Sequence, residues 1–154
     1  MITGSDFVAA LREAGITDIP WLPDSELGRW ESALAAAITP RLIRVCREGE
    51  ALAIAAGLLI GGRTPLVAMQ CTGLFEAGDS LRNFAHDLKL PLRVLVGVRS
   101  WRAYLQQQTA DTCPSFTIPI IEAWGIPYRW LDGTMADLLA ALNEPGPRFY
   151  LLPE

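Results

Sequence analysis

Two periodicities of apolar and polar residues run through the chain, and together they predict its helices and strands. Apolar residues recur at helical spacing in several segments, of which the first is expected to be capped by Ser5 and ended by Gly15. Between these segments lie short, nearly continuous apolar runs, which are typical of strands buried on both faces of a sheet. The predicted helices span residues 6–14, 24–37, 48–60, 76–88, 116–124 and 134–143, and the predicted strands span residues 18–23, 41–46, 65–70, 91–97, 127–131 and 148–153.

The regular alternation of helices and strands predicts the fold class. A strand, a helix and a further strand form a parallel crossover, and each crossover lays its helix on the sheet. We therefore expect an α/β fold in three layers, with a six-stranded, mostly parallel sheet and helices on both faces. The polar residues 100–115 are expected to form a long loop. No repeat, linker or low-complexity tract divides residues 1–154, which predicts a single domain.

Composition and charge exclude several classes of function. Of the 154 residues 51% are hydrophobic and only 19% are charged, so we expect another subunit to cover part of the apolar surface. The net charge of −4 and the dispersed basic residues argue against nucleic-acid binding. The sequence has no signal-peptide pattern and no apolar run of the ~18 residues that a membrane span needs. With three scattered cysteines and one histidine, it predicts a cytoplasmic protein without a zinc site.

Ligands of open parallel sheets bind beyond the carboxyl ends of the strands, which directs attention to residues 21–25, 44–50 and 68–80. The chain contains no GxGxxG or GxxxxGK[ST] phosphate loop and no GxSxG nucleophile elbow. His86 is interpreted as structural and Cys71 as a buried thiol rather than a nucleophile. Arg99 and Arg102 follow a strand and are candidates to hold an anion. Glu48 opens a helix, where an acid also suits the helix dipole.

An ordered set of motifs resembles a known family. Residues 47–81 contain Glu48-Gly49, then Gly57, then "GRTPLV" and "QCTGL". "LPDSEL" stands before this segment and "LPLRVLVGVRS" after it. In this order the motifs resemble the pyrimidine-binding domain of thiamine-diphosphate-dependent decarboxylases, most of all the sulfopyruvate decarboxylase alpha subunits and the phosphonopyruvate decarboxylases.

The resemblance implies a role for each matched residue. Glu48 would hydrogen-bond the aminopyrimidine ring of thiamine diphosphate and so activate the cofactor, which carries the chemistry of 2-oxo acid decarboxylation. The apolar helix that follows would leave room for a flat ring at Ala51 and Ala55, and Gly57 would permit close backbone packing. The resemblance places Pro23, Gln70, Thr72, Gly73 and Leu74 at the cofactor, and Asp24, Ser25 and Arg99 at the substrate.

The chain also departs from the family's pattern. Phe75, Glu76 and Asp79 replace a glycine and two asparagines, which predicts a bulkier and more acidic pocket. The family's Gly-Asp-Gly and downstream Asn-Asn, which hold Mg²⁺ and the diphosphate, are absent. The resemblance therefore implies no metal site on this chain, a partner beta subunit that carries the Mg²⁺-diphosphate domain, and paired alpha chains. A carbon–carbon ligase of the same family and a non-catalytic α/β binding or regulatory module stay open as alternatives, and the 2-oxo acid is not identified.

Overall fold

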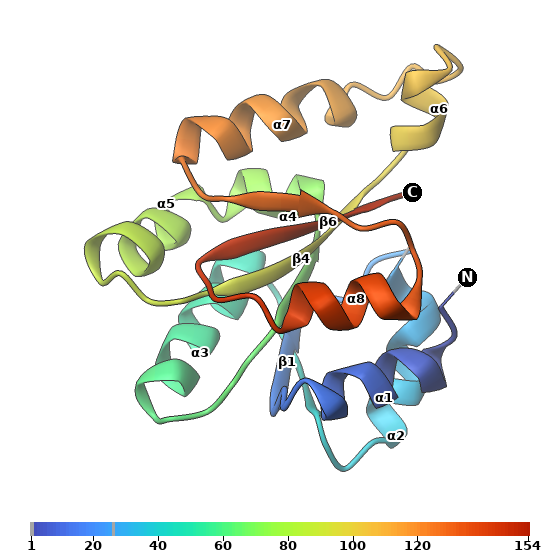
Figure 1. Ribbon diagram of the computed structural model, residues 1–154. Helices are drawn as coiled ribbons and strands as arrows, with labels where there is room; N and C mark the ends of the chain where they lie inside the picture. Colours follow the sequence, from blue (N-terminus) through green and yellow to red (C-terminus); the bar gives the residue numbers. More distant parts are fainter. Residues whose placement is uncertain (1, 26) are drawn as a thin grey trace.

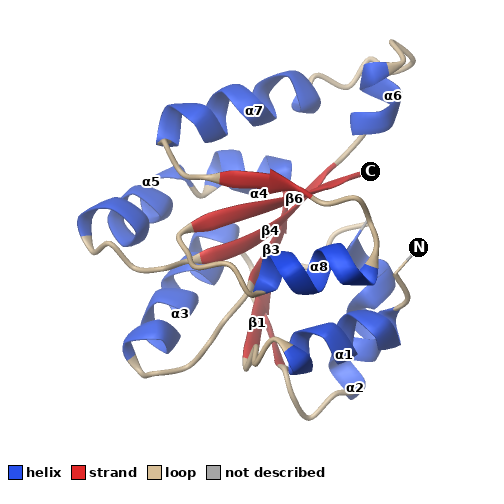
Figure 2. Ribbon diagram, viewed as in Figure 1, coloured by secondary structure: helices blue, strands red, loops and turns tan. Residues whose placement is uncertain are grey.

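Six parallel strands form one sheet in the order β2-β1-β3-β4-β6-β5 (Figures 1 and 2). The computed structural model describes residues 2–25 and 27–154. Every strand pairing is parallel, so the carboxyl ends of the strands meet at one edge of the sheet. This confirms the predicted α/β fold. The strands are β1 (Asp18–Trp21), β2 (Arg41–Arg44), β3 (Val67–Gln70), β4 (Arg93–Val98), β5 (Tyr128–Trp130) and β6 (Arg148–Pro153).

Helices cover both faces of this sheet and create two cores. Along β6, Tyr150 and Leu152 face one core, whereas Phe149 and Leu151 face the other, as the two-residue period of a strand requires. The first core lies under α1 (Gly4–Glu13), η1 (Leu27–Trp30), α2 (Glu31–Ala36) and α8 (Met135–Leu142). The second lies under α3 (Glu48–Ile60), α4 (Cys71–Glu76), α5 (Gly78–Leu81), η2 (Arg82–Asp87) and α7 (Cys113–Trp124). No helix within the described ranges is long and apolar enough to cross a membrane.

The start of α1 differs from its prediction. Thr3, and not Ser5, caps the helix, because its hydroxyl accepts the Asp6 N–H while the Asp6 carboxylate accepts the Thr3 N–H. This capping box satisfies two donors at once. The predicted helix at 24–37 begins instead at Leu27 and is divided into η1 and α2; Glu26, which falls in that prediction, lies outside the described residues.

The predicted helix at 76–88 begins earlier, at Cys71, and is divided into α4, α5 and the π-helical turn η2. The sequence predicts no helix over residues 71–75, which include threonine and glycine, two poor helix formers. Burial outweighs that propensity here, since the Cys71 and Leu74 side chains are fully buried against the sheet. As a result a helix starts directly where β3 ends.

The predicted loop at 100–115 contains a short helix and the first turn of another. In α6 (Trp101–Leu105), the Trp101 ring stacks on Trp130 with their centroids 4.5 Å apart. Helix α7 begins at Cys113 and takes Pro114 into its first turn, where the missing N–H of proline has no helical partner to lose. Polar composition alone does not show such packing.

Candidate functional site

Glu48 is the first residue of α3, at the edge of the sheet where the strands end. The chain leaves β2 extended, with Val45 N–H still bonded to Trp21 O, and turns into the helix after Arg47. The Glu50 carboxylate reaches back to accept the Cys46 N–H at 3.0 Å. Glu50 therefore holds the segment just before the helix, whereas Glu48 forms no such bond.

The side chain of Glu48 lies against Gly73 of α4. A Cβ atom on residue 73 would overlap with Cγ, Cδ and Oε1 of Glu48. Gly73 is buried and helical, so its lack of a side chain serves space rather than backbone conformation. The structure thus brings together Glu48 and the motif "QCTGL", which lie more than twenty residues apart in the sequence.

Glu48 is also unusual in its bonding. Its side chain is only partly exposed, yet within residues 2–25 and 27–154 its carboxylate forms no hydrogen bond or ion pair. By contrast, the partly buried carboxylates of Glu31, Asp111, Asp137 and Glu144 each pair with an arginine, and the buried Asp18 pairs with two. Leaving a half-buried carboxylate without a partner is unfavourable, and this arrangement is typical of a group that bonds a ligand.

The loop after β1 holds Pro23, Asp24 and Ser25. Asp24 accepts the Leu27 N–H at 2.8 Å and faces the Trp21 indole N–H at 3.5 Å, so its carboxylate holds the turn into η1. Pro23 is partly exposed and Ser25 is exposed. Of the two predicted substrate residues in this loop, Ser25 has the more accessible side chain.

The residues that follow β3 have different surroundings. Gln70 and Thr72 are partly exposed, and the Thr72 hydroxyl donates to Gln70 Oε1 at 3.1 Å. Leu74 is fully buried in the core, so its side chain fixes α4 to the sheet and does not reach the site. Gln70 and Thr72 therefore form the accessible part of this motif, and the buried Gly73 is the part that contacts Glu48.

Arg99 follows β4 and is bonded within the chain. Its Nε lies 2.7 Å from Asp111 Oδ2, to which the Ser100 hydroxyl also donates. The Cys113 N–H and then Arg99 hold the pKa of the Asp111 carboxyl well below its usual range, although partial burial opposes this. A paired arginine offers an anion less charge than a free one.

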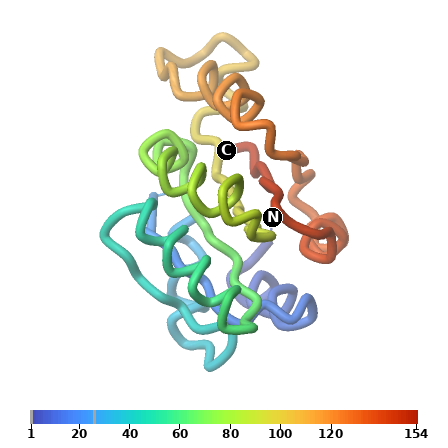
Figure 3. The backbone as a smooth tube through the Cα atoms, turned by 90° about the vertical axis from the view of Figure 1, so that its left-hand side faces the viewer, coloured from blue at the N-terminus to red at the C-terminus, as the bar shows by residue number. Residues whose placement is uncertain are grey.

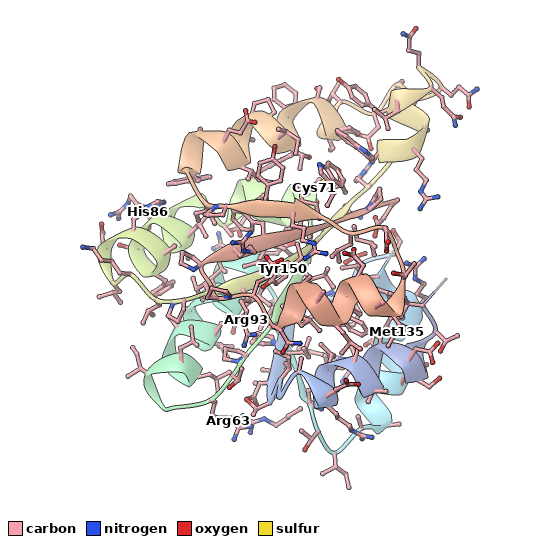
Figure 4. The ribbon with its side chains drawn as sticks, viewed as in Figure 1. Arg63, Cys71, His86, Arg93, Met135 and Tyr150 are labelled. Carbon is pink, nitrogen blue, oxygen red and sulfur yellow. The ribbon has the colours of Figure 1, made fainter. Side chains whose placement is uncertain are left out.

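Cys71 and His86 occupy the places expected for structural residues. Burial raises the pKa of the Cys71 thiol, which disfavours the thiolate that a nucleophile requires. His86 is exposed at the outer end of the α5–η2 run, well apart from Cys71, and stacks on Trp124 (Figure 4). Among the described residues no group of three or more histidine, cysteine or acidic side chains could hold a metal ion.

Two expectations for α3 are wrong. Ala51 and Ala55 face the core with no exposed surface, so they leave no room for a ring. Gly57 is exposed, and a Cβ atom added there would meet nothing within 4 Å. The position that does require glycine is 73.

Sequence reasoning missed what Glu76 does. The sequence predicts an acid that lines a pocket, and Glu76 does line the hollow beside α3, but its carboxylate also bonds Arg47 and the Gly49 N–H. These two residues flank Glu48 in the chain. The only sequence signal was the substitution of an asparagine by glutamate within an otherwise matching motif.

Two hollows lie near this edge of the sheet. One, of about 390 Å³, is lined by Arg47, Gly49, Glu50, Glu76, Asp79 and Ser80, beside the start of α3. The other, of about 500 Å³, lies beside the end of β6, and its lining includes Arg29, Trp30 and Arg102. The Arg102 predicted as an anion holder therefore lies at the second hollow. Neither hollow is lined by the described residues assigned to the cofactor, and the first contains the residues on either side of Glu48.

Comparisons with known proteins point to one group of enzymes. No family model matches the sequence. The phosphonopyruvate decarboxylases of Streptomyces hygroscopicus and Streptomyces viridochromogenes are each 31% identical over 102 residues, which cover 66% of this chain and 25% of theirs. The crystal structure of benzoylformate decarboxylase from Polynucleobacter necessarius matches with a TM-score of 0.72 and 20% identity, over 99% of this chain and 30% of that one.

Sequence and fold together show a domain like the pyrimidine-binding domain of thiamine-diphosphate-dependent decarboxylases. This pyrimidine-binding-like domain spans about a quarter of the length of the curated relatives that it matches. The benzoylformate decarboxylase shares its fold, and the phosphonopyruvate decarboxylases share 31% of the residues over the matched part of the sequence.

Proposed function

We propose that this chain is the alpha subunit of a split thiamine-diphosphate-dependent 2-oxo acid decarboxylase and that Glu48 is its catalytic carboxylate. The observation that carries the proposal is the unpartnered, partly buried carboxylate of Glu48 over Gly73. It lies beyond the strand ends of a parallel sheet, where ligands of such folds bind. The curated relatives that are 31% identical over 102 residues are named phosphonopyruvate decarboxylases.

The residues around Glu48 fit an aminopyrimidine ring. Glu48 would share a proton with a ring nitrogen of thiamine diphosphate, because its side chain makes no hydrogen bond among the described residues and can accept when ionised or donate when protonated. Gln70 and Thr72 are the neighbouring polar side chains that would orient the ring, together with Pro23 from the loop after β1. When bound, the cofactor would supply the electron sink for loss of carbon dioxide.

The substrate side of the site would use Ser25 and Arg99. Ser25 is an exposed hydroxyl on the loop after β1, and Arg99 carries a guanidinium that is partly exposed while paired with Asp111. Because Asp111 already offsets that charge, we propose a 2-oxo acid with one carboxylate in preference to a more strongly anionic substrate.

The Mg²⁺ and the diphosphate would be held by a partner beta subunit. The sequence lacks the family's diphosphate motif, and within the described residues no acidic or histidine cluster suits a metal ion. A paired arrangement of alpha chains would cover part of the apolar surface, which includes Ile60 and Leu105 among its exposed side chains.

Replacement of Glu48 tests the proposal. The chain is combined with the product of a neighbouring gene that carries the diphosphate motif, in the presence of thiamine diphosphate, Mg²⁺ and either pyruvate, benzoylformate or phosphonopyruvate. Carbon dioxide release should fall at least about 100-fold in Glu48→Gln, since a positioned proton-transfer group contributes roughly 10² to 10⁴ in rate. Glu50→Gln is the matched control, because it removes the same charge from the same helical turn.

Equal turnover in wild type and Glu48→Gln would contradict the role of Glu48. Thiamine diphosphate binding without carbon dioxide release, but with a coupled product from two carbonyl compounds, would favour a carbon–carbon ligase. Absence of cofactor binding by the mixture would favour the non-catalytic module.

A further inference from the structure

One carboxylate holds both chain neighbours of Glu48. Glu76 Oε1 accepts from the Arg47 guanidinium, with Nε at 3.0 Å, and Glu76 Oε2 accepts the Gly49 N–H at 3.2 Å. Glu76 and, more weakly, Glu48 raise the pKa of Arg47. The residue before Glu48 and the residue after it are thus tied to the same side chain.

The same helix also supports Glu48 directly. Gly73 and Glu76 are three residues apart in α4, so both face the start of α3. Gly73 lies under the Glu48 side chain, and Glu76 bonds the residues on either side of it. Figures 1 and 3 show α3 and the α4–η2 run side by side on one face of the sheet.

The space around Gly49 is tight, so a larger residue would be hard to place there. A Cβ atom on Gly49 would lie 3.0 Å from Ser80 Oγ and 3.7 Å from Glu76 Oε2. Arg47 occupies the N-cap position of α3, but its side chain forms no hydrogen bond to the backbone N–H groups of the first turn. A negative side chain at Gly49 N–H therefore satisfies one of the free donors of the first turn and complements the helix dipole.

We propose that Glu76 is a positioning residue, which fixes the first turn of α3 so that the Glu48 carboxylate stays over Gly73. This inference rests on the proposed function for its catalytic consequence. Its structural content is separate: without Glu76 the Glu48 side chain samples several rotamers and the Gly49 amide opens to solvent.

This role differs from a contribution to overall stability. The Arg47 side chain is 76% exposed, and ion pairs at such exposed positions contribute little to the free energy of unfolding. Loss of Glu76 should therefore disorder Glu48 while the melting temperature changes little. The Glu31–Arg44 pair is a suitable control, because Glu31 has the same side-chain exposure as Glu76 and also joins a helix to a neighbouring element, but it bonds neither Arg47 nor Gly49.

The first experiment uses the full chain alone, labelled for nuclear magnetic resonance. In Glu76→Ala, hydrogen exchange of the Gly49 amide should accelerate at least about tenfold, because its acceptor is removed. The side-chain couplings of Glu48 should change from values for one rotamer to averaged values. Glu76→Gln, which retains an acceptor oxygen, should restore much of both signals, and Glu31→Ala should leave both unchanged. Unchanged Gly49 exchange and an unchanged single rotamer of Glu48 in Glu76→Ala would overturn the inference.

The second experiment measures turnover of the assembled enzyme. Glu76→Ala should lower kcat by roughly ten- to hundredfold with little change in KM, because a misplaced catalytic group costs about that much. Glu76→Gln should recover part of the loss. If Glu76→Ala turned over substrate as fast as the wild type, the inference would be overturned. An inactive wild-type assembly would contradict the proposed function alone, since the Gly49 and Glu48 signals of the isolated chain still decide the positioning role.

Discussion

Glycine at position 73 leaves the volume that the Glu48 side chain fills. In Gly73→Ala the new methyl group would overlap with Glu48, whose partly exposed side chain would swing out to relieve the contact. We expect the proposed turnover to fall about 100-fold, as for other misplaced catalytic groups. The free energy of unfolding should change by less than about 1 kcal/mol, because alanine is the better helix former by about that amount. Turnover assays and chemical denaturation of the same preparation check both values.

Gly57→Ala is the companion variant for that measurement. Gly57 lies in the middle of α3 with open space around it, so alanine should stabilise the chain by about 0.5 to 1 kcal/mol. If Gly57→Ala lowered the free energy of unfolding, the open space found around position 57 would be contradicted. The sequence motif predicts that both Gly57 and Gly73 are important. Only the structure shows that the Glu48 side chain needs glycine at position 73 and not at position 57.

Asp18 of β1 connects neighbouring segments of the chain at the opposite edge of the sheet, where the strands begin. Its buried carboxylate bonds Arg41 at 3.0 Å and Arg63 at 2.6 Å, which joins β1 to β2 and to the segment before β3 (Figure 4 labels Arg63). Burial opposes ionisation, but the bonds from Arg63, Thr17 and Arg41 prevail and lower the pKa of Asp18. Asp18→Asn should cost about 2 kcal/mol in the free energy of unfolding at pH 7, in line with charged hydrogen bonds elsewhere.

The pH dependence of that difference follows from the lowered pKa. A carboxyl group with a depressed pKa in the folded state stabilises the fold above its ordinary pKa of 3.8, and this contribution is lost as the pH falls through the lower folded value. The gap between wild type and Asp18→Asn should therefore shrink below about pH 4. Urea denaturation at pH 7, 5 and 3 measures it, and a constant gap would contradict the assignment.

The elements that sequence predicted well are those whose ends carry strong local signals. Helix α3 has the predicted bounds 48–60, because Gly61 and Gly62 end it, and β6 has its predicted bounds between Pro147 and the end of its apolar run. The sequence does not predict the start of α4 or the short helix α6, because the burial of Cys71 and Leu74 and the packing of Trp101 on Trp130 depend on residues distant in sequence. The same limit applied to Glu76, whose partners precede it by more than twenty-five residues.

At the scale of the whole molecule, this chain resembles one part of a longer enzyme. The 102 matched residues cover only 25% of each curated relative, and the described residues include the proposed pyrimidine side of a site but no metal cluster. The diphosphate carries most of the charge of thiamine diphosphate and needs Mg²⁺ and oxygen ligands to balance it. A site without these ligands has only a ring to bind.

We therefore expect the isolated chain to bind thiamine diphosphate and Mg²⁺ more weakly than the mixture with its beta partner by at least about 100-fold, which corresponds to roughly 2.7 kcal/mol. Isothermal titration calorimetry on the chain, the partner and their mixture measures the three affinities. Thiamine without its diphosphate is the control, because it retains the ring that Glu48 would contact and lacks the group that the partner would hold. Equally tight binding by the chain alone would place the diphosphate site on this polypeptide and contradict the split arrangement, while leaving the role of Glu48 to the Glu48→Gln assay.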